Sequence, residues 1–234
     1  PSRRLRKSPF EARSHTGAKA TSVYNHVVLP TAYVSLEDDY WHLREHVQIW
    51  DVACQVQVEV KGPDALKLVE FLTPRDLSSM VPGQCVYAPL LDERAGIVND
   101  PIILCLAQDH FWLSISDSDV LLWVKGLALG AGFDVTVSDP DVFPLSLQGP
   151  KSEALLGRLI DEPVGDIRFF RFIETQITGI PLVVARTGWS GQGGFELYLK
   201  EPSEGERLWD TISDAGIDLN LRPGCPNLID RTDT

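Results

Sequence analysis

Hydrophobic and polar positions along the chain change period several times. Apolar residues from Leu36 to Trp50 recur at helical spacing, behind a capping pattern formed by Ser35 and Asp38. This pattern predicts an amphipathic helix as the first strong element of the chain. Residues 1–22 are polar and basic, so we expect them to form an arm on the surface.

After this helix the period changes to that of strands joined by short turns. Helices are expected at 64–72, 118–132, 151–160 and 204–216. Strands are expected at 54–60, 84–91, 97–107, 110–116, 133–137, 142–149, twice within 169–186, and at 194–200, with coil from 222 onward. Tight turns between strands, with helices interspersed, predict an α+β fold with mainly antiparallel sheets.

Composition and charge narrow the function classes. The 234 residues carry 21 Lys and Arg against 33 Asp and Glu, a net charge of −12, which argues against a nucleic-acid partner. No run of 18 apolar residues exists, so a membrane-spanning helix is not expected. Four widely spaced cysteines form no CxxC pair and indicate a reduced, cytoplasmic setting.

A short motif in the first helix raises the question of a metal. His42 and His46 with Glu45 match H-x-x-E-H, the inverted zinc-peptidase pattern, and the i, i+4 spacing places both imidazoles on one helix face. So short a pattern arises easily by chance, and no third ligand is recognisable. We therefore expect a solvated helix face and no metal site.

The hairpin YAPLLDERAGIVNDP is the first candidate site. If Leu91 and Gly96 close a four-residue loop, antiparallel pairing places Tyr87 directly opposite Asp100. Pro101 then marks an edge or a break in the strand. Spacing alone supports two interpretations of Asp100 equally. It is either a functional acid or a carboxylate that caps a turn or pairs with an arginine.

The glycine-rich segment RTGWSGQGGFELY is the second candidate. Its glycines allow unusual dihedrals or close approach of the backbone to a ligand. Strand alternation places Glu196 and Tyr198 on one face, opposite Phe195 and Leu197. A long hairpin turn with a solvent-facing Glu and Tyr is the simpler alternative.

At these segments the sequence resembles the folate-dependent aminomethyltransferase family, typified by the T-protein of the glycine cleavage system. The resemblance is carried by QIWDVACQVQVEVKGPDALKLVEFLTPRDL, YAPLLDERAGIVNDP, SLQGPKS and RTGWSGQGGFELY. Segments such as DYWHLREHVQIWDV, GIVNDP and RPGCPNLI are most similar to the branch of dimethylsulfoniopropionate demethylase and its near relatives. The resemblance covers nearly the whole chain.

The resemblance implies a folate-binding aminomethyltransferase domain of two interleaved lobes. The first lobe is expected at 1–55 with 142–234, and the second at 56–141. In the family, the chain continues after an arginine that Arg231 matches, and a C-terminal β-barrel completes the fold. Because only Thr-Asp-Thr follows Arg231, we expect that barrel to be absent from this chain.

Residue roles follow from the resemblance position by position. Asp100 matches the acid beside the folate amines, where a carboxylate can steer a cationic donor and hold charge near the accepting N5. Glu196 matches the acid that holds the pterin through two parallel hydrogen bonds. Tyr87, Trp189 and Tyr198 match aromatic positions around the folate, where flat rings suit a planar heterocycle.

The reaction implied is transfer of a one-carbon group from a small sulfonium or amine donor to N5 of tetrahydrofolate. The partners expected are tetrahydrofolate and a small-molecule methyl donor, and a homo-oligomer stays open. A glycine-cleavage aminomethyltransferase is an alternative, although Asn99 replaces that protein's first hairpin acid. A non-catalytic folate-binding protein and an inactive fragment are the others.

Overall fold

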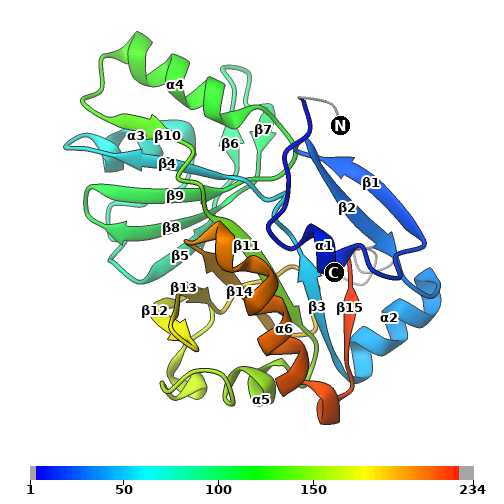
Figure 1. The fold of residues 1–234 in the computed structure, drawn as a ribbon. Helices are drawn as coiled ribbons and strands as arrows, with labels where there is room; N and C mark the ends of the chain where they lie inside the picture. Colours follow the sequence, from blue (N-terminus) through cyan, green and yellow to red (C-terminus); the bar gives the residue numbers. More distant parts are fainter. Residues whose placement is uncertain (1–3, 227–234) are drawn as a thin grey trace. The chain divides into compact units, whose positions relative to one another are not determined.

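The computed structural model describes residues 4–226, and the chain divides into two compact units (Figure 1). Unit 1 is Pro1–Cys54 with Phe143–Thr234, and unit 2 is Gln55–Val142. The boundaries expected from the sequence lie one residue away from these. Each unit combines helices with mainly antiparallel strands, which confirms the predicted α+β class.

Unit 1 is built on a six-stranded sheet. Its order is β12 (Phe172–Ile177), β13 (Ile180–Ala185), β14 (Gly194–Leu199), β11 (Phe143–Gln148), β3 (Val47–Asp51) and β15 (Leu221–Gly224). All neighbours are antiparallel except β15, which pairs in parallel with β3. The last strand lies in the stretch expected to be coil, so that prediction was wrong.

The two faces of this sheet differ in chemistry. One face is apolar and packs on α5 (Ser152–Leu156) and α6 (Gly205–Ala215), where Leu145, Leu197 and Trp209 share one core (Figure 1). Because side chains alternate along each strand, the residues between them point to the other face. That second face carries polar and aromatic side chains, namely Gln48, Trp50, Ser146, Gln148, Glu196 and Tyr198.

The N-terminal segment corrects two predictions. Residues 1–22 were expected to form a surface arm, but Phe10 is fully buried and its ring lies 6.5 Å from that of Trp209. Helix α1 (Glu11–Ser14) and a hairpin of β1 (Ala20–Tyr24) and β2 (Val27–Ala32) precede the helix that was expected to be the first element.

The expected helix from Leu36 to Trp50 also ends early. Helix α2 (Leu36–Glu45) begins as predicted, with the Ser35 hydroxyl accepting the Asp38 amide at 3.0 Å. The chain then becomes β3, all five residues of which are buried. Strand β3 was mistaken for helix because Val47 and Trp50 are three residues apart, which continues the helical spacing of the apolar residues before them.

Unit 2 contains a five-stranded antiparallel sheet. Its order is β10 (Thr136–Ser138), β4 (Gln57–Lys61), β9 (His110–Ser114), β8 (Ile102–Ala107) and β5 (Gln84–Tyr87). Helices α3 (Ala65–Leu72) and α4 (Val120–Ala131) pack on one face and share a core with that sheet. Strands β6 (Leu90–Leu91) and β7 (Ile97–Asn99) form a separate hairpin.

Other element bounds were predicted only in part. The strand expected from residue 54 begins at Gln57, and the helix expected over 151–160 is the single helix α5, Ser152–Leu156. The helix expected at 64–72 is confirmed as α3. The tail after Pro226, including Arg231, lies outside the described residues.

Two general expectations can be compared with the described residues. None of the described helices has the length and apolarity needed to cross a membrane. All four cysteines are buried, so they are small core residues, as the apolar stretches around three of them predicted.

Candidate functional site

The first candidate group lies in unit 2 around Asp100. The side chain is exposed, and it accepts hydrogen bonds from the hydroxyls of Tyr87 at 3.1 Å and Ser116 at 2.6 Å. The predicted pairing of Tyr87 with Asp100 was wrong, because Tyr87 pairs with Ile102. A register shift between Leu90 and Leu91 moves the strands out of the expected alignment. The Tyr87 hydroxyl nevertheless reaches Asp100.

Asn99 holds the backbone around this carboxylate. Its Oδ1 accepts the amides of Asp100 and Ser116, both at 3.0 Å, and its Nδ2 donates to the Ser116 carbonyl and the Ser118 hydroxyl. Asn99 is 4% exposed, so these contacts are sheltered from water. The described residues give Asp100 no ion pair. The carboxylate is thus fixed by hydroxyl groups and is exposed to solvent.

The second group lies in unit 1 around Glu196. The side chain is 4% exposed, and Tyr198 is fully buried, so the alternative of a solvent-facing Glu and Tyr is wrong. The Thr187 hydroxyl donates to Oε2 of Glu196 at 2.5 Å, and the Tyr198 hydroxyl donates to the same oxygen at 3.2 Å. Burial raises the pKa of Glu196, and these two hydrogen bonds oppose that rise.

The glycine-rich turn is shaped around the side chain of Gln148. A Cβ on Gly188 or Gly194 would lie 2.6 Å from Gln148 Nε2, and both glycines have positive φ. Gln148 Oε1 accepts the Ser190 hydroxyl at 2.6 Å, while Nε2 donates to the Ser146 hydroxyl at 2.8 Å. The close approach made possible by these two glycines is therefore to Gln148 and, at Gly194, also to the Leu147 carbonyl, so the turn lies tightly against β11.

Trp189, at the tip of this turn, packs on Trp50. Their ring centroids are 5.7 Å apart at an interplanar angle of 56°. Trp50 is 1% exposed and donates from Nε1 to Gln48 Oε1 at 2.7 Å, whereas Trp189 is half-buried. Trp189 therefore has a ring that packs on a buried neighbour and is itself only partly exposed.

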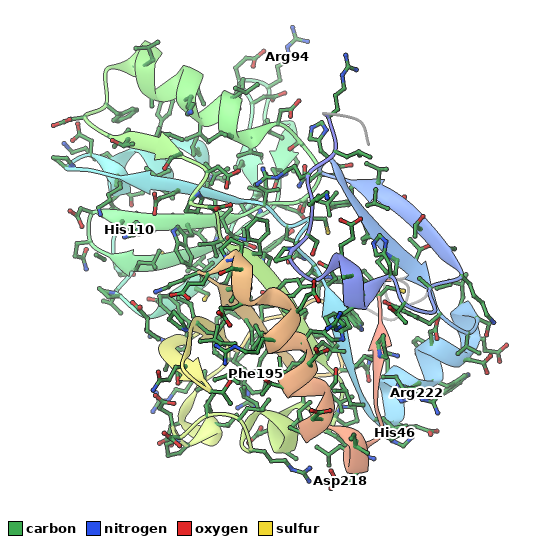
Figure 2. All side chains as sticks on the ribbon, viewed as in Figure 1. His46, Arg94, His110, Phe195, Asp218 and Arg222 are labelled. Atoms are coloured by element: carbon green, nitrogen blue, oxygen red, sulfur yellow. The ribbon has the colours of Figure 1, made fainter. Side chains whose placement is uncertain are left out.

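In the H-x-x-E-H motif, each histidine has a ring nitrogen in contact with a protein group. His42 Nε2 lies 2.9 Å from the Asn220 carbonyl, and His46 Nδ1 lies 2.8 Å from the Lys151 ammonium. Figure 2 shows Arg222 beside His46, and burial together with nearby positive charge lowers the pKa of both histidines. Within residues 4–226, His, Cys, Asp and Glu form no group of three that could hold a metal.

The structure therefore brings the predicted residues together in part. Tyr87 contacts Asp100 within unit 2, and Tyr198 contacts Glu196 within unit 1. Sequence reasoning missed Thr187 and Ser116, which orient the two acids, and Gln148, which holds the glycine-rich turn. A signal for Gln148 was present, because Ser146 and Gln148 are the polar positions of an otherwise apolar strand.

Comparison with known proteins identifies the family. The model of the GCVT N-terminal domain matches residues 10–229, which is nearly the whole chain. The chain belongs to this family.

Two curated relatives of the GCVT domain family differ in their closeness to the chain. The chain is 50% identical over 235 residues to dimethylsulfoniopropionate demethylase DmdA of Ruegeria pomeroyi, covering all of this chain and 65% of the demethylase. It is 33% identical over 231 residues to an aminomethyltransferase of Lysinibacillus sphaericus, covering 94% of this chain and 62% of that protein. The chain thus spans somewhat less than two thirds of these relatives.

Solved structures of relatives support the fold. The glycine cleavage system aminomethyltransferase T of Bartonella henselae superposes with a TM-score of 0.81 at 24% identity, over 94% of this chain and 59% of that protein. Heterotetrameric sarcosine oxidase from Corynebacterium superposes with a TM-score of 0.62 at 19% identity. Both likenesses concern the fold of the GCVT domain family.

Proposed function

We propose that this protein moves a one-carbon group from a small donor to N5 of tetrahydrofolate, and that the donor is a sulfonium of the dimethylsulfoniopropionate type. The single observation that carries the folate proposal is Glu196, a buried carboxylate without a cation beside it in the described structure. The 50% identity to the demethylase supports the choice of donor.

The geometry of Glu196 fits a pterin. Both protein hydrogen bonds end on Oε2, and in the described residues Oε1 has no hydrogen-bond donor. An acceptor atom that the protein leaves without a donor can take the N–H groups of a ligand, and those hydrogen bonds would stabilise the ligand. The N–H and amino groups at one edge of a pterin can donate these hydrogen bonds, and Glu196 would hold that edge.

The donor chemistry suits Asp100. When bound, tetrahydrofolate supplies N5 as the nucleophile. A sulfonium methyl transfer breaks a carbon–sulfur bond, forms a carbon–nitrogen bond and releases a thioether, and the nitrogen's proton passes to solvent. Asp100 would attract the cationic donor and stabilise the positive charge during transfer. Tyr87 and Ser116 would hold its carboxylate in place, and no enzyme nucleophile is needed.

The proposal is tested by calorimetric titration of the purified chain with tetrahydrofolate. We expect binding by the wild-type chain and a loss of at least about tenfold in Glu196→Gln, since one charge-assisted hydrogen-bonded pair is removed. Asp51→Asn is the matched control, because Asp51 is another buried carboxylate of the same sheet, held by Ser14 and the Ala53 amide. A folded wild-type chain that binds no tetrahydrofolate would contradict the proposal.

Incubation with tetrahydrofolate and candidate donors then tests the donor class. Dimethylsulfoniopropionate should give methylated folate, measured by chromatography. Product formed only from an aminomethylated lipoyl carrier would favour the glycine-cleavage reaction instead.

A further inference from the structure

The carboxyl group of Glu196 is buried without a cation beside it in the described structure. On the sheet, its neighbours in register are Ser146 on β11 and Ala185 on β13, and neither carries a charge. The two cations nearest in sequence are paired elsewhere. Lys200 pairs with Glu174 at 2.6 Å, and Arg186 pairs with Glu153 at 2.7 Å and lies over the ring of Phe195, on the opposite face. Uncharged hydroxyl groups are therefore the protein's means of holding this carboxylate.

Two hydroxyls do this unequally. Thr187 Oγ1 is 2.5 Å from Oε2 of Glu196, and the Tyr198 hydroxyl is 3.2 Å from the same atom. Thr187 is 2% exposed and follows directly after Arg186, whose amide and carbonyl bond to Arg171 and Phe170. This fixed backbone delivers the Thr187 hydroxyl to one oxygen of the carboxylate and leaves the other available.

We propose that Thr187 is a positioning residue for the ligand of this site: its hydroxyl keeps Glu196 ionised and holds Oε1 as the acceptor. The proposed role of Thr187 in the ionisation of Glu196 does not depend on the ligand's identity, whereas the consequence for folate rests on the proposed function.

The physical reason lies in the balance around a buried acid. Burial raises the pKa of Glu196, because the low-dielectric interior disfavours the charged form. A hydrogen bond donated to the carboxylate favours the charged form and opposes this rise, and a short bond does so most. If Glu196 took up a proton it would become a donor, and it could no longer accept two N–H groups from a ligand.

The experiment is an infrared titration of the unliganded protein, with Glu196→Gln subtracted to isolate the carboxylic-acid band of Glu196. In Thr187→Val, which keeps the shape and removes the hydroxyl, we expect the midpoint to rise by about one pH unit or more. Thr187→Ser, which restores the hydroxyl, should titrate like the wild type. Thr175→Val is the matched control, since Thr175 donates to the exposed Glu162 at 2.7 Å.

Each outcome decides the proposal. A midpoint in Thr187→Val equal to that of the wild type overturns the proposal. So does a Thr187→Val variant that, at every pH where the wild type shows no carboxylic-acid band, shows none either. Failure of Thr187→Ser to restore the midpoint shows a merely structural role and also overturns it.

A second arm separates this proposal from the proposed function. Tetrahydrofolate affinity should fall as Glu196 becomes protonated, at a higher pH in Thr187→Val than in the wild type. If the infrared midpoint moves but the folded wild type binds no tetrahydrofolate, the ionisation role stands and the folate assignment fails. If tetrahydrofolate binds but the midpoint does not move, the role of Thr187 fails and the folate assignment stands.

Discussion

Asp100 and Glu196 are both carboxylates held by a pair of hydroxyl groups, but their surroundings differ. Asp100 is exposed, and its two donors reach different oxygens, so both oxygens are fixed. Glu196 is buried, and both donors reach one oxygen. An exposed charge attracts a cation through solvent, whereas a buried acceptor selects a ligand by its N–H groups. Asp100 is therefore suited to attracting a cationic donor, and Glu196 to holding a ligand through its N–H groups.

At the residue scale, this difference predicts how Asp100→Asn behaves. Asparagine keeps the shape and can still accept from Tyr87 or Ser116, so the free energy of unfolding should change by no more than about 0.5 kcal/mol. Loss of the charge should lower the single-turnover rate of methyl transfer by about 100-fold while tetrahydrofolate affinity changes little. Glu93→Gln, an exposed acid of the same hairpin, is the control. Full activity in Asp100→Asn would show that the assignment of Asp100 is wrong.

At the scale of elements, helix α2 is attached to its sheet through a buried, neutral histidine. His42 Nε2 lies 2.9 Å from the Asn220 carbonyl and 3.3 Å separates Nδ1 from Gln48 Nε2, so Nε2 carries the proton and Nδ1 accepts. Burial, together with the charge of Arg222, lowers the pKa of His42 to about 4, from an ordinary value of 6.5. Protonation of His42 would turn Nδ1 into a donor that faces another donor, the Gln48 Nε2 group.

This lowered pKa predicts a specific pH dependence. The unfolded chain takes up a proton on His42 near pH 6.5 and the folded chain only near pH 4, so stability is full above 6.5 and is lost as the pH falls from 6.5 to 4. The loss attributable to His42 should be about 3 kcal/mol. Denaturant unfolding across this range should show a flatter profile for His42→Gln than for the wild type. His26→Asn, at an exposed histidine, is the control, and parallel profiles for His42→Gln and wild type would contradict this account.

Elements were predictable where local signals agreed with the tertiary structure. The Ser35 cap correctly placed the start of α2, and the helix expected over 118–132 ends at Gly132, which is a left-handed C-cap in the structure. The end of α2 was not predictable, because β3 is buried on both faces and its apolar spacing imitates a helix. Strand β15 contains Pro223 and Gly224 and depends on pairing with β3, a contact far away in sequence.

The candidate site was predictable only as far as its acids. Alternation correctly placed Glu196 and Tyr198 on one face of β14, opposite Phe195. The role of Thr187 was hidden, because its hydroxyl reaches Glu196 from the segment between two strands, across nine residues of sequence. Likewise Ser116 reaches Asp100 across sixteen residues. Such contacts follow from how the turns fold, which the residue pattern does not encode.

At the scale of the whole molecule, unit 2 interrupts unit 1 between β3 and β11 yet contains its own core. The hydrogen bonds of its five-stranded sheet all join strands within residues 55–142. Its buried apolar cluster, which includes Leu68, Leu113 and Val124, is drawn from the same range. At 88 residues it falls within the usual size of an independent domain.

We therefore expect the excised segment 55–142 to fold by itself, because neither its sheet nor its apolar cluster needs a strand from unit 1. It should unfold cooperatively with denaturant and show dispersed amide resonances. Leu113→Ala is the informative variant: Leu113 is fully buried, so a specifically packed core should lose about 2–5 kcal/mol of stability. A loosely collapsed chain would scarcely respond to that deletion. Non-cooperative unfolding, or an unchanged transition in Leu113→Ala, would show that unit 2 acquires its packing only within the intact chain.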